Sequence, residues 1–111
     1  MPIQTDLTIP LSALTFLEDG VATVIPESWN TTQIGVLLQT VIEQHADAQL
    51  KNQTLHFVSV TYDVSAEVES GTDVRFESRI DRRTRTLIFA SGLARQGDRN
   101  LLKATVVFRL T

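Results

Sequence analysis

The chain of 111 residues contains no cysteine. Disulfide bridges and thiolate chemistry are therefore excluded. No stretch approaches the roughly 20 apolar residues that a membrane-spanning helix needs. The segment from Met1 to Asp6 carries neither a basic nor an apolar run, so no signal peptide is expected. These absences make the cytoplasm the default expectation, with no membrane partner.

Basic residues are scarce in the first part of the chain. Residues 1–70 hold nine acidic residues and one basic residue, a net charge of −8, whereas residues 71–111 hold nine basic and four acidic residues, a net charge of +5. The positive second part can attract an anionic ligand although the whole chain carries −3. An aromatic content of 6% and an isoelectric point near 5.2 argue against nucleic acid as the partner.

The length fits one domain, spanning residues 1–111, because domains commonly run to roughly 100–150 residues. A chain of this size can fill one core but has little surplus for a deep, enclosed active site. If there is a site, a subunit interface is where we expect it.

The first half of the sequence predicts one strand and one long helix. Residues 1–17 have no clear period and are interpreted as an arm with room for a short strand. Residues 21–25 read as a strand that Pro26 ends. A helix is predicted over residues 33–48, with Asn30, Thr31 or Thr32 as its cap. Its apolar positions follow helical spacing and are Ile34, Leu37, Leu38, Val41, Ile42 and Ala48, while Gln39, Thr40, Glu43 and Asp47 form the opposite stripe.

After the helix the apolar period changes to two. Residues 55–68 have one apolar face, formed by His56, Val58, Val60, Tyr62, Val64, Ala66 and Val68. Residues 101–110 likewise point to one side Leu102, Ala104, Val106, Phe108 and Leu110. Strands are predicted over residues 55–68, 73–81, 85–95 and 101–110, separated by turn-forming segments. The result is an α+β protein with one long helix and an antiparallel sheet of about five strands. The strands exceed the common length of about five to six residues, so the sheet must curl and can wrap the helix. Residues 85–95 are apolar on both faces, which one helix cannot cover, so a homodimer or homotetramer is expected.

The order of these segments resembles the hotdog fold, and within it the acyl-CoA thioesterases of the phenylacetate-pathway and 4-hydroxybenzoyl-CoA type. The resemblance covers about residues 20–110. It is carried by the strand and turn segments 60–64, 71–74, 82–86, 95–98 and 102–105. It implies a curled sheet around a central helix, a dimer, and a thioester substrate on coenzyme A or an acyl-carrier protein. No separate cofactor is implied, since coenzyme A belongs to the substrate.

The resemblance also implies catalytic residues on the helix. In this family a glycine near the helix start presents its N–H to the thioester carbonyl, and a carboxylate eight positions later is the nucleophile or general base. Gly35 and Glu43 have that spacing, and Gln39 or Thr40 would orient the water. The His-Gly-Gly that the family often has reads Ile34-Gly35-Val36 here, and its preceding asparagine is replaced by Ser28.

Each of these features has a plainer interpretation. Glu43 can belong to a solvated helix face, and Gly35 can serve tight packing. The arginines Arg82, Arg83 and Arg85 form either a solubilising hairpin tip or a docking surface for the phosphates of coenzyme A.

Four further alternatives concern the histidines and the class of protein. His45 and His56 read as hydrogen-bonded core or interface residues, and no spacing predicts a metal site. The rival to a thioesterase is a non-catalytic hotdog protein that binds an acyl group or serves as an assembly partner. A cone-shaped cystatin-like or nuclear-transport-like domain is a third interpretation. Hydratases are disfavoured, because no Asp/His pair is found at the helix or its approach.

Overall fold

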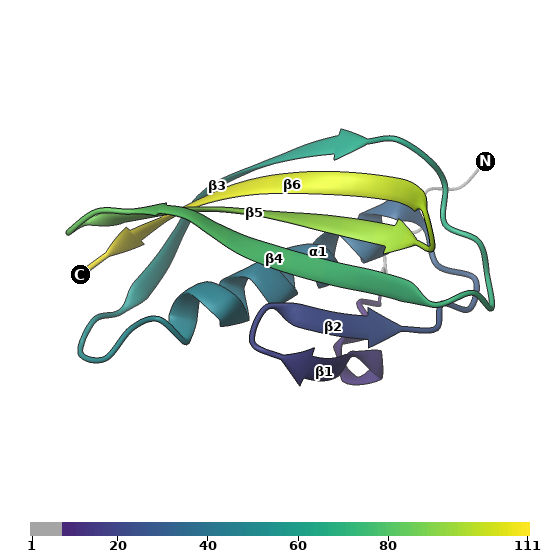
Figure 1. Ribbon diagram of the computed structural model, residues 1–111, viewed down its shortest axis with the longest axis horizontal. Helices are drawn as coiled ribbons and strands as arrows, with labels where there is room; N and C mark the ends of the chain where they lie inside the picture. The colour runs from purple at the N-terminus through teal and green to yellow at the C-terminus, as the bar shows by residue number, and fades with distance from the viewer. Residues whose placement is uncertain (1–7) are drawn as a thin grey trace.

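One long helix packs against one curled, open sheet in the computed structural model, which describes residues 8–111 (Figure 1). The sheet has six antiparallel strands in the order β1-β2-β4-β5-β6-β3. The elements are η1 (Leu11–Ala13), β1 (Thr15–Glu18), β2 (Val21–Val24), α1 (Thr31–Asp47), β3 (Leu55–Val64), β4 (Val74–Arg83), β5 (Leu87–Gln96) and β6 (Arg99–Leu110). The predicted α+β class is confirmed, with one strand more than the sequence suggested.

The additional strand lies in the N-terminal arm. β1 pairs with β2 through a hairpin at Gly20, whose φ of 80° favours glycine. All four residues of β1 are exposed, and the strand lies at one edge of the sheet. The first part of the predicted arm, residues 1–7, lies outside the described residues.

The helix begins two residues earlier than predicted. Asn30 is the N-cap, and it forms a capping box in which its side chain accepts from the Gln33 N–H while the Gln33 side chain accepts from the Asn30 N–H, both at 2.9 Å. These bonds satisfy amides that the first turn would otherwise leave free. The predicted apolar stripe is confirmed for Ile34, Leu37, Leu38, Val41 and Ile42, which are buried, whereas Ala48 is the exposed C-cap.

The core fills the space between α1 and the concave face of the sheet. β6 supplies the side chains that the alternation predicted, namely Leu102, Ala104, Val106, Phe108 and Leu110, all buried. Phe76 from β4 and Ile88 from β5 complete the layer under the helix. At the close contact between helix and sheet, β5 carries Gly92, because a Cβ there would lie 2.7 Å from Cδ1 of Ile42.

The strand predicted over residues 55–68 ends at Val64, so its last four residues were assigned wrongly. Ser65 and Ala66 both donate their N–H groups to the carbonyl of Leu101, which ends the regular ladder with β6. The following loop is held by the buried side chain of Gln96. Gln96 donates to the carbonyls of Glu69 and Thr72 and accepts from the Glu69 N–H.

The apolar face predicted for this strand is mostly not buried. β3 is an edge strand that pairs only with β6, and its register shifts between Phe57 and Ser59. Val58 is 54% exposed and Val64 is 58% exposed, whereas Val60 is half-buried against the core. Apolar and polar residues do alternate along β3. However, the strand order places β3 at an edge of the sheet, where α1 covers few of its side chains.

Candidate functional site

An apolar hollow lies between the first two turns of α1 and the second half of β3. We call it the Gly35 hollow; it measures about 240 Å³ and is lined by Thr31, Thr32, Gly35, Val36, Tyr62, Val64 and Leu102. Thr31 and Thr32 occupy the first helical positions after the Asn30 cap. The hollow therefore joins an apolar wall to the end of the helix at which backbone N–H groups lack helical acceptors.

Tyr62 closes this hollow toward the middle of the helix. Its hydroxyl donates to Oε1 of Gln39 at 2.7 Å and lies 3.3 Å from the carbonyl oxygen of Gly35. Burial raises the pKa of the Tyr62 phenol above its ordinary value. The ring rests on the helix because residue 35 has no side chain: a Cβ there would lie 3.3 Å from Cε1 of Tyr62.

Tyr62 was not predicted to be a site residue. The sequence predicted only that it lies on the apolar face of its strand, and its being the single tyrosine of the chain was the one available signal. The contact also gives Gly35 a packing role, which was the plainer of its two interpretations.

A second hollow lies further along the helix. We call it the Glu43 hollow; it measures about 340 Å³ and is lined by Thr40, Glu43, Gln44, Asp47 and Leu55. Glu43 is exposed there, and the Thr40 hydroxyl donates to the carbonyl of Val36 at 2.8 Å. The two hollows lie on either side of Gln39 along α1, with Gly35 in one and Glu43 in the other. Both are lined by α1 and β3, and we call the side of the molecule between these two elements the groove.

The earlier start of α1 changes the surroundings of the Gly35 amide. Ile34 N–H donates to the Asn30 carbonyl at 3.1 Å. Since α1 begins at Thr31, the regular pairing of each N–H with the carbonyl four residues earlier assigns the Gly35 N–H to the Thr31 carbonyl. Gly35 therefore lies beyond the first turn. The amides of Thr31 and Thr32 precede the ladder, and these two residues line the Gly35 hollow.

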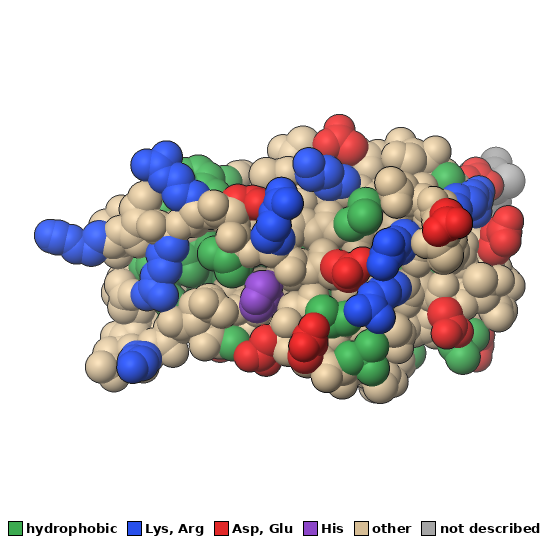
Figure 2. Space-filling model, in the orientation of Figure 1, with side chains coloured by type: hydrophobic (Ala, Val, Ile, Leu, Met, Phe, Trp, Pro, Cys, Tyr) green, Lys and Arg blue, Asp and Glu red, His purple; other side chains and the backbone are tan. Residues whose placement is uncertain are grey.

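The three arginines proposed for phosphate binding lie at the exposed β4–β5 hairpin tip. Figure 2 shows basic side chains at the left end of the molecule, where β4 turns into β5 in Figure 1. Arg83 donates to the carbonyl of Gln49 and to Oε1 of Gln53, which ties the tip to the end of α1. Arg82 lies over the Phe89 ring at 5.9 Å, and Arg85 is exposed. The cluster is therefore near the Glu43 end of the helix.

The two histidines have hydrogen-bond partners. Nδ1 of His45 lies 3.0 Å from Oγ of Ser78, and Nε2 of His56 lies 2.7 Å from Oγ1 of Thr111. Among residues 8–111, no group of three potential ligands is placed to hold a metal ion. No helix in the same part of the chain is long and apolar enough to cross a membrane.

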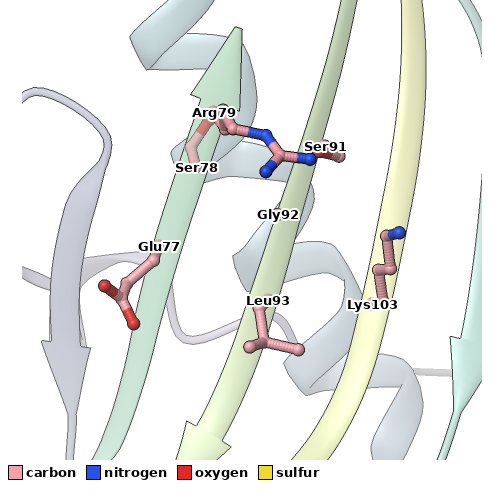
Figure 3. A pocket seen from close by; sticks show the side chains of 7 residues that line it. All are labelled: Glu77, Ser78, Arg79, Ser91, Gly92, Leu93 and Lys103. Atoms are coloured by element: carbon pink, nitrogen blue, oxygen red, sulfur yellow. The ribbon is translucent and has the colours of Figure 1, made fainter. Parts of the chain in front are cut away.

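A third hollow lies on the outer face of the sheet and has a different character (Figure 3). It is a shallow depression of about 550 Å³, lined by Glu77, Ser78, Arg79, Ser91, Gly92, Leu93 and Lys103. Most of the charges around it are paired: Glu77 with Arg95 at 2.9 Å, and Arg79 with Asp81 at 2.6 Å. Acidic and basic side chains are interspersed on this face in Figure 2. A charged, open surface of this kind does not suit an acyl chain.

Asp81 illustrates how these outer charges balance one another. Burial pushes the pKa of its carboxyl upward, but hydrogen bonds from Ser91 and Arg79 and the positive charges of Arg79 and Lys103 outweigh this effect. The net shift of the Asp81 pKa is downward.

No family model matches the chain, and no curated protein matches it. Solved structures do. The protein smu.793 from Streptococcus mutans, bound to acetyl-CoA, has a TM-score of 0.76 at 13% identity over 88% of this chain and 86% of its own. The protein BH2602 from Bacillus halodurans, solved with CoA, has a TM-score of 0.73 at 16% identity over 83% and 67%.

A third similar structure is the phenylacetic acid degradation-related protein of Ralstonia eutropha JMP134, which is named as a thioesterase. Its TM-score is 0.73 at 15% identity, over 95% of this chain and 93% of its own. At such low identity the likeness to these structures concerns architecture alone, and that architecture is the hotdog fold. The predicted hotdog fold is thereby confirmed.

Proposed function

We propose that the chain hydrolyses an acyl thioester of coenzyme A, or of an acyl-carrier protein, in the groove between α1 and β3. The Gly35 hollow is the observation that carries this proposal. It combines apolar walls from Val36, Val64 and Leu102 with the backbone amides of a helix start. An acyl chain needs the first feature, and a developing oxyanion needs the second.

A second copy of the chain would complete the site. Gly35 and Glu43 are eight residues apart on one helix, which is about 12 Å at ~1.5 Å per residue. A general base must come within about 3 Å of its target, so one copy cannot use both residues on one carbonyl. The matching Glu43 would therefore come from the partner subunit.

β3 is the edge along which two copies would pair. Its outer side is unpaired, and it exposes the apolar side chains of Phe57, Val58, Tyr62 and Val64. Such an edge favours pairing with another strand. Two-fold, antiparallel pairing of β3 reverses the second helix, which would bring its Glu43 hollow toward the Gly35 hollow of the first copy.

The chemistry assigns one task to each group. The amide of Gly35, or those of Thr31 and Thr32 ahead of it, would stabilise the oxyanion. Glu43 of the partner subunit would attack the carbonyl or deprotonate a water that does so, with Gln39 or Thr40 orienting that water. Collapse of the tetrahedral species breaks the C–S bond. When water is the nucleophile, the proton that Glu43 took from it passes to the leaving thiolate. When Glu43 itself attacks, the thiolate takes a proton from solvent, and a water then hydrolyses the acyl-Glu43 anhydride to release the carboxylic acid and restore Glu43.

The basic hairpin tip would bind the phosphates of coenzyme A. Arg82, Arg83 and Arg85 lie at the Glu43 end of α1, so in a two-fold dimer the tip of one copy would approach the Gly35 hollow of the other. Arginine forks suit bidentate contacts with phosphate oxygens. The CoA-bound hotdog structures of B. halodurans and S. mutans support a ligand of this class.

A non-catalytic acyl or CoA binder is the second candidate. Two observations favour it: the Gly35 amide falls within the helical ladder, and Glu43 is exposed. In this case the groove would hold the acyl group without activating water.

A panel of acyl-CoA thioesters, followed with a thiol reagent, separates the two candidates. Release of thiol that depends on the protein supports the hydrolase. Measurable CoA binding, with no thiol released from any member of the panel, would favour the non-catalytic binder instead.

A further inference from the structure

We propose, on the basis of the function proposed above, that Tyr62 limits the length of the acyl group and makes the site selective for short chains. The Gly35 hollow is lined on the helix side by residues up to Val36, and the Glu43 hollow begins at Thr40. Between them lies Gln39, whose side chain accepts the Tyr62 hydroxyl. The Tyr62–Gln39 contact is thus a partition across the groove.

The Tyr62 ring is restrained from several sides. Its hydroxyl is hydrogen-bonded to Gln39 at 2.7 Å. On the helix side, its Cε1 atom lies so close to Gly35 that a Cβ on residue 35 would be only 3.3 Å away. In the sheet, Tyr62 is in register with Ala104 of β6, a small residue that leaves the space above it to the ring. These contacts leave the ring free to make a slight shift, but they oppose the much larger displacement that the passage of a longer ligand would require.

The sizes of the hollows agree with a short acyl group. The Gly35 hollow, at about 240 Å³, is smaller than the roughly 300–1,000 Å³ of common small-molecule pockets. The Glu43 hollow, at about 340 Å³, lies beyond Gln39 along the helix. Val36, Val64 and Leu102 give the smaller hollow an apolar wall, which suits an alkyl group better than a charged one.

Replacing the ring with a smaller side chain is expected to lengthen the accepted acyl group. The ligands are non-hydrolysable thioether analogues of butyryl-, octanoyl- and dodecanoyl-CoA, and binding is measured by calorimetry. Wild type should favour the butyryl analogue. Tyr62→Val, which keeps a residue suited to strands, should improve the affinity for the dodecanoyl analogue relative to the butyryl analogue by at least about tenfold.

Two matched variants control for this result. Tyr62→Phe keeps the ring but loses the hydrogen bond to Gln39, so its preference for the butyryl analogue should fall less than that of Tyr62→Val. Thr61→Ala changes the exposed neighbour on the opposite face of β3 and should leave all three affinities unchanged.

A second test does not depend on Tyr62→Val folding well. Val64→Trp places a large side chain at an exposed strand position of the same hollow and should weaken the octanoyl analogue by at least about tenfold. A folded Val64→Trp protein that binds the octanoyl analogue as wild type does would overturn the proposal.

The outcomes separate this inference from the proposed function. A shifted length preference without hydrolysis supports the role of Tyr62 and removes the hydrolase. Hydrolysis by wild type, with the same length profile in Tyr62→Val, overturns the role of Tyr62 and leaves the hydrolase standing. If no analogue binds to any variant, both are overturned.

Discussion

Gly92 of β5 and Ile42 of α1 are in contact so close that no other residue fits at position 92 without movement. A Cβ on residue 92 would lie 2.7 Å from Cδ1 and 2.9 Å from Cγ1 of Ile42, and 2.9 Å from Cδ1 of Leu38. This contact fixes how deeply the helix sits in the curled sheet. The position of α1 in turn determines the width of the groove beside β3.

Gly92→Ala is therefore expected to destabilise the protein by about 1–3 kcal/mol, measured by denaturant unfolding. Ile42→Val removes the nearest clashing atom and should cost about 0.5–1.5 kcal/mol alone. In the double variant the two losses should be less than additive, because the shorter side chain makes room for the new methyl group. Additive losses would show that Ile42 does not set this contact.

Gly35→Ala should behave differently although Gly35 is also buried. Alanine favours a helix over glycine by about 1 kcal/mol. This gain is opposed by the contact of the new Cβ with the Tyr62 ring, at 3.3 Å. The Tyr62 side chain is 36% exposed and lies on an edge strand, so the ring can shift slightly. We expect the free energy of unfolding to stay the same or to rise by up to about 1 kcal/mol.

The functional consequence of Gly35→Ala follows from the same contact. A displaced Tyr62 ring should alter acyl binding without loss of fold. If Gly35→Ala instead lowers the free energy of unfolding by several kcal/mol, the Tyr62 ring cannot shift, and residue 35 is constrained by packing alone.

The single tyrosine permits a direct check of the groove by absorbance titration. Because burial raises the pKa of Tyr62, the native protein should ionise above the ordinary value of about 10. The unfolded chain ionises first, so this contribution to stability is complete below pH ~10 and is lost as the pH rises through the folded pKa. Tyr62→Phe should lack this part of the pH dependence, and a native midpoint no higher than that of the unfolded chain would contradict the burial.

Glu43→Ala should abolish thioester hydrolysis, with a loss of at least about 100-fold, while the fold is retained. The side chain is exposed, so the unfolding free energy should change by no more than about 0.5 kcal/mol. Asp47→Asn removes another exposed carboxylate of the same hollow and is the matched control, expected to keep the activity. Equal turnover by wild type and Glu43→Ala would remove Glu43 from the mechanism.

Much of the architecture was predictable because its signals are local. The period of two from Leu102 to Leu110 placed five side chains in the core correctly, and the spacing from Ile34 to Ile42 identified the buried stripe of α1. In each case the pattern reflects which side of one element meets the core. The charged hairpin tip between β4 and β5 was likewise found from adjacent residues.

The parts that could not be predicted depend on distant contacts. Tyr62 meets Gly35 only because β3 returns beside the helix, 27 residues later in the chain. The exposure of Val58 and Val64 follows from the sheet order, which places β3 at an edge. The end of β3 at Val64 depends on β6, whose Leu101 carbonyl accepts both following amides.

Mixing two inactive variants measures most directly whether two copies build one site. Val64→Trp blocks the Gly35 hollow and Glu43→Ala removes the carboxylate, so neither protein alone should hydrolyse a thioester. After subunit exchange, half of the dimers are mixed and each holds one intact site, so about a quarter of the wild-type rate should return. Two folded, exchanging proteins whose mixture stays as inactive as its components would contradict a site shared between subunits.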